Sequence, residues 1–204
     1  LDETNPGTIE ITMNVERPDG SVEAITRHWP KARILVTFAL FNPSKNDIEI
    51  LSMYSDNYGE SFSNPKQVAV TSGRDQGVSV TAMGDTVLYA FRVFGNDSEP
   101  SAIRGAISND GGNRIGKPFD IVPSLCAYDV PTFPNDSNQD VAASRTNDFP
   151  SASHNGDKFI VAYSERRPSS DGGCFTTFDQ PVDSRVKVIA GSANGKNWGT
   201  PIEV

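Results

Sequence analysis

Short apolar runs separated by polar turns recur along the 204-residue chain. Residues 78–91 (VSVTAMGDTVLYAF) and 150–163 (PSASHNGDKFIVAY) share one pattern, in which a strand of small residues, a glycine–aspartate turn and a strongly apolar strand follow one another. Glycine beside aspartate between two such runs is typical of a β-hairpin. A weaker copy spans residues 23–41, with its turn near Pro30. The pattern predicts antiparallel strands and no amphipathic helix of useful length.

A further strand, a polar turn and a fourth strand follow each hairpin. The third strands read DIEILSMY, AIRGAIS and RVKVIAGS, and the fourth strands read PKQVAV, KPFDIV and TPIEV. The turns share a serine, an Asp or Asn, a glycine and a large apolar residue, and the third is one residue shorter. Their residues are Ser55, Asn57, Gly59 and Phe62; Ser108, Asp110, Gly112 and Ile115; and Ser192, Asn194, Gly195 and Trp198. Four strands in each unit of roughly 50 residues predict a repeat array.

The turn Ser-x-Asp-x-Gly-x-x-aromatic resembles the Asp-box, or BNR repeat, of sialidase-like β-propellers. This resemblance covers residues 23–204 and implies an all-β propeller of four-stranded antiparallel blades. Residues 1–22 are then an edge strand of a preceding blade, residues 23–70 and 71–123 are two blades, and residues 124–204 are a third blade with two long insertions. In the family the box is structural, so its residues are assigned no chemistry. A β-sandwich is the alternative all-β fold, although it gives no reason for one turn to recur at corresponding positions.

Three blades do not close a ring, since propellers typically contain about four to eight. We therefore expect the rest of a longer chain, or a second polypeptide, to complete it.

The composition narrows the class of partner and the compartment. The net charge of −8 and the pI near 4.7 disfavour nucleic-acid binding, which needs clustered Lys and Arg. No apolar run is long enough to span a membrane, and no motif indicates a metal or another cofactor. Cys126 and Cys174 lie in the polar insertions, and we expect them to form a disulfide. A disulfide favours an extracellular, periplasmic or cell-surface location.

The insertions carry the candidate binding residues. One insertion precedes the third hairpin and the other joins its second and third strands, so both should emerge on the same side of the fold. The expected ligand-binding residues are Tyr128, Arg166, Arg167, Phe175 and Phe178.

The match to a sialidase active site is partial. Residues 163–168 (YSERRP) are similar to the family's general-acid segment, but Ser164 stands where the aspartate is expected, which leaves Glu165 and Arg166 as weak catalytic candidates. Residues 148–150 (DFP) replace the Arg-Ile-Pro that the family uses to bind a substrate carboxylate. The leading hypothesis is therefore non-catalytic recognition of a glycan or an extracellular protein. The alternatives are a glycoside hydrolase with its other catalytic residues outside this segment, and a structural module of an extracellular assembly.

Overall fold

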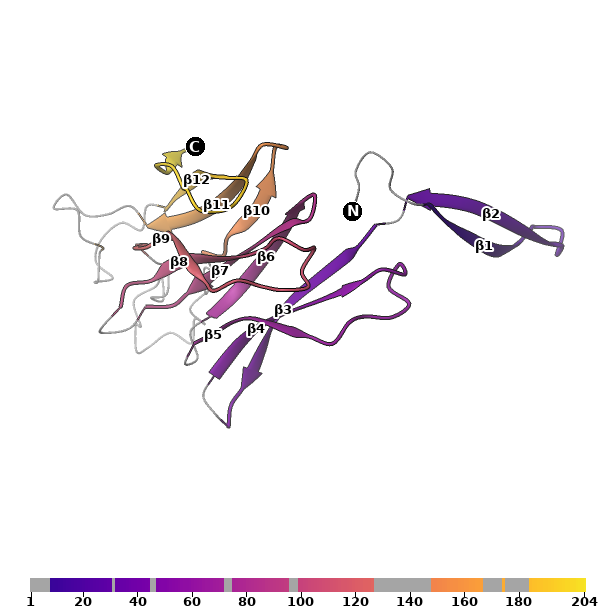
Figure 1. Ribbon diagram of the computed structural model, residues 1–204, viewed down its shortest axis with the longest axis horizontal. Coiled ribbons are helices and arrows are strands. Elements are labelled where there is room, and N and C mark those ends of the chain that lie inside the picture. The colour runs from indigo at the N-terminus through magenta and orange to yellow at the C-terminus, as the bar shows by residue number, and fades with distance from the viewer. Residues whose placement is uncertain are drawn as a thin grey trace, which may run out of the picture.

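The computed structural model describes residues 8–30, 32–44, 47–71, 75–95, 99–126, 148–166, 174 and 184–204. These residues form thirteen strands in four antiparallel sheets and contain no helix, so the described chain has no helix that could cross a membrane. Three sheets are stacked face to face, and a two-stranded hairpin extends away from them (Figure 1). The all-β prediction is confirmed.

Each sheet is formed by strands that are consecutive along the chain. The hairpin contains β1 (Thr8–Glu16) and β2 (Val22–Pro30). The first stacked sheet contains β3 (Ile34–Asn42), β4 (Asp47–Ser55) and β5 (Lys66–Thr71). The middle sheet contains β6 (Asp75–Met83), β7 (Thr86–Val93), β8 (Ala102–Ser108) and β9 (Phe119–Val122). The last sheet contains β10 (Ser151–His154), β11 (Lys158–Arg166), β12 (Ser184–Ser192) and β13 (Ile202–Glu203). Each strand pairs with its neighbour in sequence within its sheet.

The N-terminal hairpin corrects one prediction. Residues 23–30 were expected to pair with the strand that follows them, but β2 pairs with β1 along its whole length. The reason is a strong local turn between β1 and β2. Gly20 has a positive φ of 79°, and Asp19 Oδ1 accepts hydrogen bonds from the amide and hydroxyl of Ser21. Because this turn closes β1 onto β2, the first stacked sheet contains only three strands.

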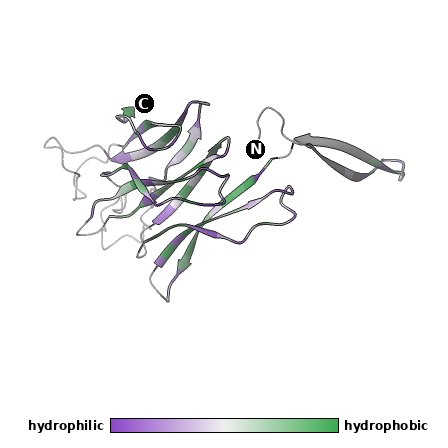
Figure 2. Cartoon of the chain, viewed as in Figure 1, coloured by the Kyte–Doolittle hydropathy of each residue, from purple (hydrophilic) through white to green (hydrophobic). Residues whose placement is uncertain are grey.

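The middle sheet supplies most of the core because both of its faces are covered. Along β7, Val87, Tyr89 and Phe91 belong to the cluster shared with the first sheet. Leu88 and Ala90 point the other way and belong to the cluster shared with the last sheet. This alternation explains why β7 is apolar along nearly its whole length. Figure 2 shows hydrophobic residues along the stacked strands and hydrophilic residues at the turns.

The polar turns lie at the same corner of the three stacked sheets, between the last two strands of each. In the first two turns, the hydroxyl oxygen of Ser55 or Ser108 accepts a hydrogen bond from the glycine amide four residues later, at 2.9 Å in both. The side-chain oxygen of Asn57 or Asp110 accepts the amide four residues later, at 3.0 and 2.8 Å. Asn and Asp therefore close the turn in the same way.

The third turn is a shortened version of the other two. The Gly199 amide donates to the Ala190 carbonyl at 2.9 Å, just as the Gly116 amide donates to the Ile107 carbonyl at 2.8 Å. In this register Gly191, rather than Ser192, stands in the position of Ser108. Ser192 is displaced by one residue, and its hydroxyl oxygen accepts from the Asn197 amide at 3.1 Å. The missing residue has changed the hydrogen-bond partner of the serine without moving the turn to another corner.

Candidate functional site

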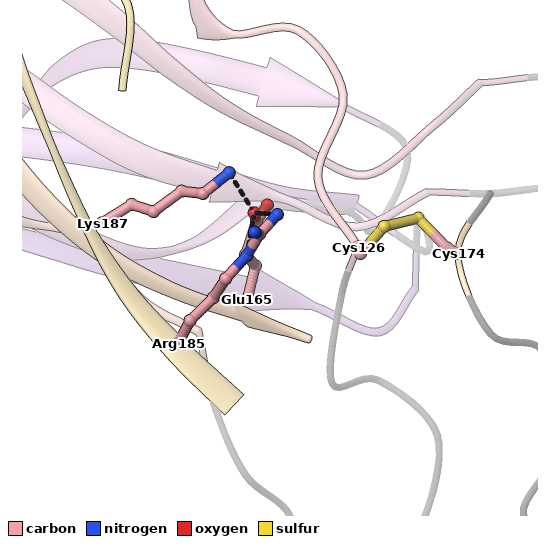
Figure 3. Close-up of a disulfide and its surroundings, with 5 residues drawn as sticks. All are labelled: Cys126, Glu165, Cys174, Arg185 and Lys187. Carbon is pink, nitrogen blue, oxygen red and sulfur yellow. Dashed lines mark hydrogen bonds and ion pairs between the residues drawn. A yellow bond between two sulfur atoms is a disulfide. The ribbon is translucent and has the colours of Figure 1, made fainter. Parts of the chain in front are cut away.

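The candidate site is the edge of the stack from which the two insertions emerge, called here the insertion edge. Cys126 follows β9, and Cys174 lies in the connection between β11 and β12. The two residues form a disulfide with their Cα atoms 5.1 Å apart (Figure 3). The Arg166 amide, at the end of β11, donates to the Cys126 carbonyl at 2.7 Å. The predicted disulfide is confirmed, and it joins Cys126, which is bonded to the end of β11, to Cys174.

Four of the predicted ligand-binding residues cannot be placed at this edge from the structure. Tyr128, Arg167, Phe175 and Phe178 lie outside the described residues. Arg166 is placed and is buried at the end of β11. The geometry is therefore described for the base of the site, which is formed by the ends of β9 and β11 and the start of β12.

Glu165 lies in a cluster of ion pairs at this base. The register of β11 and β12 sets it opposite Arg185. Its Oε1 accepts from Arg185 Nε and Nη2 at 3.0 and 2.7 Å and lies 2.5 Å from Lys187 Nζ (Figure 3). Only 5% of the residue is exposed. Because this buried carboxylate forms ion pairs with two cations, the arrangement favours a structural role for Glu165 over the role of a general acid.

Tyr163 lies two residues before Glu165, on the same face of β11. Burial raises the pKa of its phenol to about 12, with the Glu165 charge adding to the shift and Arg185 opposing it. A nucleophilic tyrosine needs help to lose its proton. The environment of Tyr163 does the opposite, and its ring packs in the core between the middle and last sheets. Tyr163 therefore fits a core residue rather than a nucleophile.

A second buried ion pair joins the middle sheet to the last sheet. Arg92, in β7, donates from Nε to Asp148 Oδ1 at 2.8 Å, and both side chains are almost completely buried. Arg92 also donates to the Val93 carbonyl, and its guanidinium lies 4.9 Å from the centre of the Phe94 ring. Asp148 was compared with the arginine that binds a substrate carboxylate in sialidases. Its burial and its partner show instead that it helps to hold two sheets together.

Asp75 occupies the corresponding place in the middle sheet. It is the first residue of β6, lies opposite Val93 and is fully buried. Asp148 lies three residues before β10, the first strand of the last sheet. Sequence reasoning missed Asp75 and Arg92. The available signal was Arg92 itself, since an arginine inside the apolar run VLYAFRVF must find a buried anionic partner.

A cleft of about 370 Å³ lies at the opposite edge, where the polar turns are. It is lined by the Gly84–Asp85 hairpin turn, by the turn around Asp110 and by Arg33. Arg33 makes two hydrogen bonds to Asp56, both of 2.7 Å, and donates to the Gly111 carbonyl at 2.9 Å. Its guanidinium is thus committed to joining the first sheet to the middle one, which makes this cleft a weaker candidate than the insertion edge.

The comparisons with known proteins give no assignment. No protein-family model matches the chain, and no curated protein matches it. The function must therefore be inferred from the residues of this chain.

Proposed function

We propose that the chain is a secreted or surface-exposed β-propeller module that recognises a glycan or protein partner through its insertion edge and catalyses no reaction. The propeller interpretation is supported by three stacked antiparallel sheets with a related turn at one corner of each. On this interpretation the turns are degenerate Asp-boxes. The disulfide supports an oxidising compartment.

The observation that carries the non-catalytic proposal is the pairing of ionisable groups at the insertion edge. Glu165 is held by two cations, Asp148 is held by Arg92, and the burial that raises the pKa of Tyr163 to about 12 makes its phenol harder to ionise. A general acid or nucleophile must reach its substrate. These buried groups instead form a rigid base for the insertions, as suits a binding site on loops held by a scaffold.

The test is a glycan array probed with the intact chain and with the double variant Cys126→Ser, Cys174→Ser. We expect one glycan class to bind the disulfide-bonded chain. The double variant should bind it more weakly by on the order of tenfold, because its insertions would have to be ordered on binding. Far-UV circular dichroism should show that both proteins retain their sheets.

A panel of fluorogenic glycosides, including sialosides, tests the alternative. Turnover that scales with the amount of chain would contradict the non-catalytic proposal and favour a glycoside hydrolase. Equal binding by the two proteins would show that the insertions do not form the site, and an array without any bound glycan would remove the glycan proposal.

A further inference from the structure

The central strand pairs of the three stacked sheets, β3–β4, β7–β8 and β11–β12, share one register, so positions along these pairs have counterparts in each sheet. Ile34 lies opposite Ser55, Val87 opposite Ser108, and Phe159 opposite Gly191. These partners are the equivalent turn positions. Because side chains on one face of a strand recur every second residue, the register fixes which residues share a face.

One face of each sheet is directed toward the preceding sheet and is called here the leading face. In the equivalent strands β3, β7 and β11 it is formed by Ile34, Val36, Phe38 and Leu40; by Val87, Tyr89, Phe91 and Val93; and by Phe159, Val161, Tyr163 and Glu165. All eight residues in the middle and last sheets are buried. In the first sheet, by contrast, Ile34 is 39% exposed and Leu40 is 46% exposed. In β3 the first leading face is therefore apolar and partly uncovered, with Glu49 of β4 beside Leu40 at one end of it.

The large residue of the polar turn follows the same rule. Ile115 packs against the core shared by the first and middle sheets, and Trp198 packs against the core shared by the middle and last sheets. Each therefore contacts the interface with the preceding sheet. Phe62, their counterpart in the first sheet, is 41% exposed. Phe62 is therefore a partly exposed aromatic residue at the turn position whose counterparts pack against the preceding sheet.

The opposite face of each sheet, called here the trailing face, is uncovered at the other end of the stack. In the middle sheet it includes Leu88, Ala90 and Ile103, which are all buried against the last sheet. Their counterparts in the last sheet are Ile160, Ala162 and Val186. Val186 is 48% exposed, and Ile202, which lies beyond Val188 on the same face, is 69% exposed. The chain therefore displays both halves of the interface that it already uses twice internally.

We propose that two copies of this chain associate head to tail, with the leading face of the first sheet in one copy packed on the trailing face of the last sheet in the other. The contact would continue the packing of sheets seen within the chain. Each contact is head to tail, and in a closed pair a two-fold axis relates the two contacts, so that the leading face of each copy packs on the trailing face of the other. Two copies supply six sheets, a number within the range of closed propellers. The proposal depends on the stacking of the sheets and not on the ligand bound at the insertion edge.

The test is sedimentation velocity on the 204-residue chain over a range of concentrations. We expect a species of twice 22.0 kDa. Leu40→Asp places a charge on the leading face, and Val186→Asp places one on the trailing face. Each should weaken association by at least about 100-fold, since burying an unpaired charge in an apolar contact is costly. Val22→Asp is the matched control, because Val22 is 66% exposed on the hairpin and should leave association unchanged.

Mixing the two face variants identifies the geometry of association. In a head-to-tail pair of one Leu40→Asp chain and one Val186→Asp chain, one of the two contacts joins unaltered faces. The mixture should therefore associate more strongly than either variant alone, which also shows that both variants are folded. A chain that stays at 22.0 kDa at all concentrations would overturn the proposal. So would masses above the dimer, a mixture without recovery, or a dimer that only one of the two face variants weakens.

Discussion

Replacement of Ser108 by alanine tests whether the polar turn stabilises the stack. The Ser108 side chain is buried, and its oxygen accepts from the Gly112 amide at 2.9 Å and from the Asp110 amide at 3.3 Å. Gly112 is also buried, so water cannot replace the lost acceptor. The hydroxyl also donates to Asp110 Oδ1 at 2.9 Å, but this carboxylate keeps its hydrogen bonds from Arg114. A buried amide left without a partner costs about 1 to 3 kcal/mol, and the longer bond to the Asp110 amide adds little. We expect Ser108→Ala to lower the free energy of unfolding by about 2 kcal/mol, or the melting temperature by about 4 to 8 °C.

Urea denaturation followed by circular dichroism measures this change, and Ser192→Ala is the matched control. The hydrogen bond between Ser192 and the Asn197 amide is exposed, so water can take the place of the hydroxyl. The control should cost less than about 0.5 kcal/mol. The reasoning would be refuted by a Ser108→Ala variant as stable as the parent, or by a control that costs as much as Ser108→Ala.

Three further substitutions, one of them with a matched control, test the charged and titratable groups. Asp148→Ala should cost about 3 to 5 kcal/mol of unfolding free energy, because it leaves Arg92 in the core without this carboxylate, whereas Asp120→Ala in an exposed pair should cost less than about 1 kcal/mol. Hydrogen bonds from Arg114 lower the pKa of Asp110, so the ionised carboxylate stabilises the fold at neutral pH. This stabilisation is lost as the pH falls below 3.8 toward the pKa in the folded state. Asp110→Asn should therefore lose less stability than the parent in an acid unfolding series. The raised pKa of Tyr163 stabilises the fold below pH 10.0, and this stabilisation should be lost as the pH rises toward about 12 in the parent but not in Tyr163→Phe, as followed by alkaline unfolding.

The elements that could be predicted from the sequence are those fixed by local chemistry. The glycine–aspartate hairpins at Gly84 and Gly156 join the strands expected from the sequence. The polar turns also occupy the expected corner because their serines and their Asn or Asp side chains bond to amides within five residues. The disulfide was predictable because two cysteines in long polar insertions have few other reasons to be there. The propeller, the partner and the non-catalytic role stay predictions.

The elements that the sequence did not reveal depend on competition or on distant partners. The pairing of β2 was missed because the Asp19–Gly20 turn closes a nearer hairpin than the one expected at Pro30. The ion pair between Arg92 and Asp148 joins residues 56 positions apart, and a single sequence offers no measure of which buried charges will meet. The partners of Glu165 depend on the register of β12, which follows a long insertion whose length does not fix that register.

The two edges of the stack are stabilised by different kinds of interaction, and this difference bears on where function can reside. At the turn edge, most stabilising bonds are local, so each turn can vary while its sheet persists, as Asn57 and the shortened third turn show. At the insertion edge, the disulfide and the ion pairs join residues 20 to 56 positions apart. Such bonds fix separate strands relative to one another, which gives the insertions a rigid base. If the proposed function holds, ordering a loop before it binds would reduce the entropic cost of binding, so changes in insertion sequence would alter recognition without disturbing the sheets beneath.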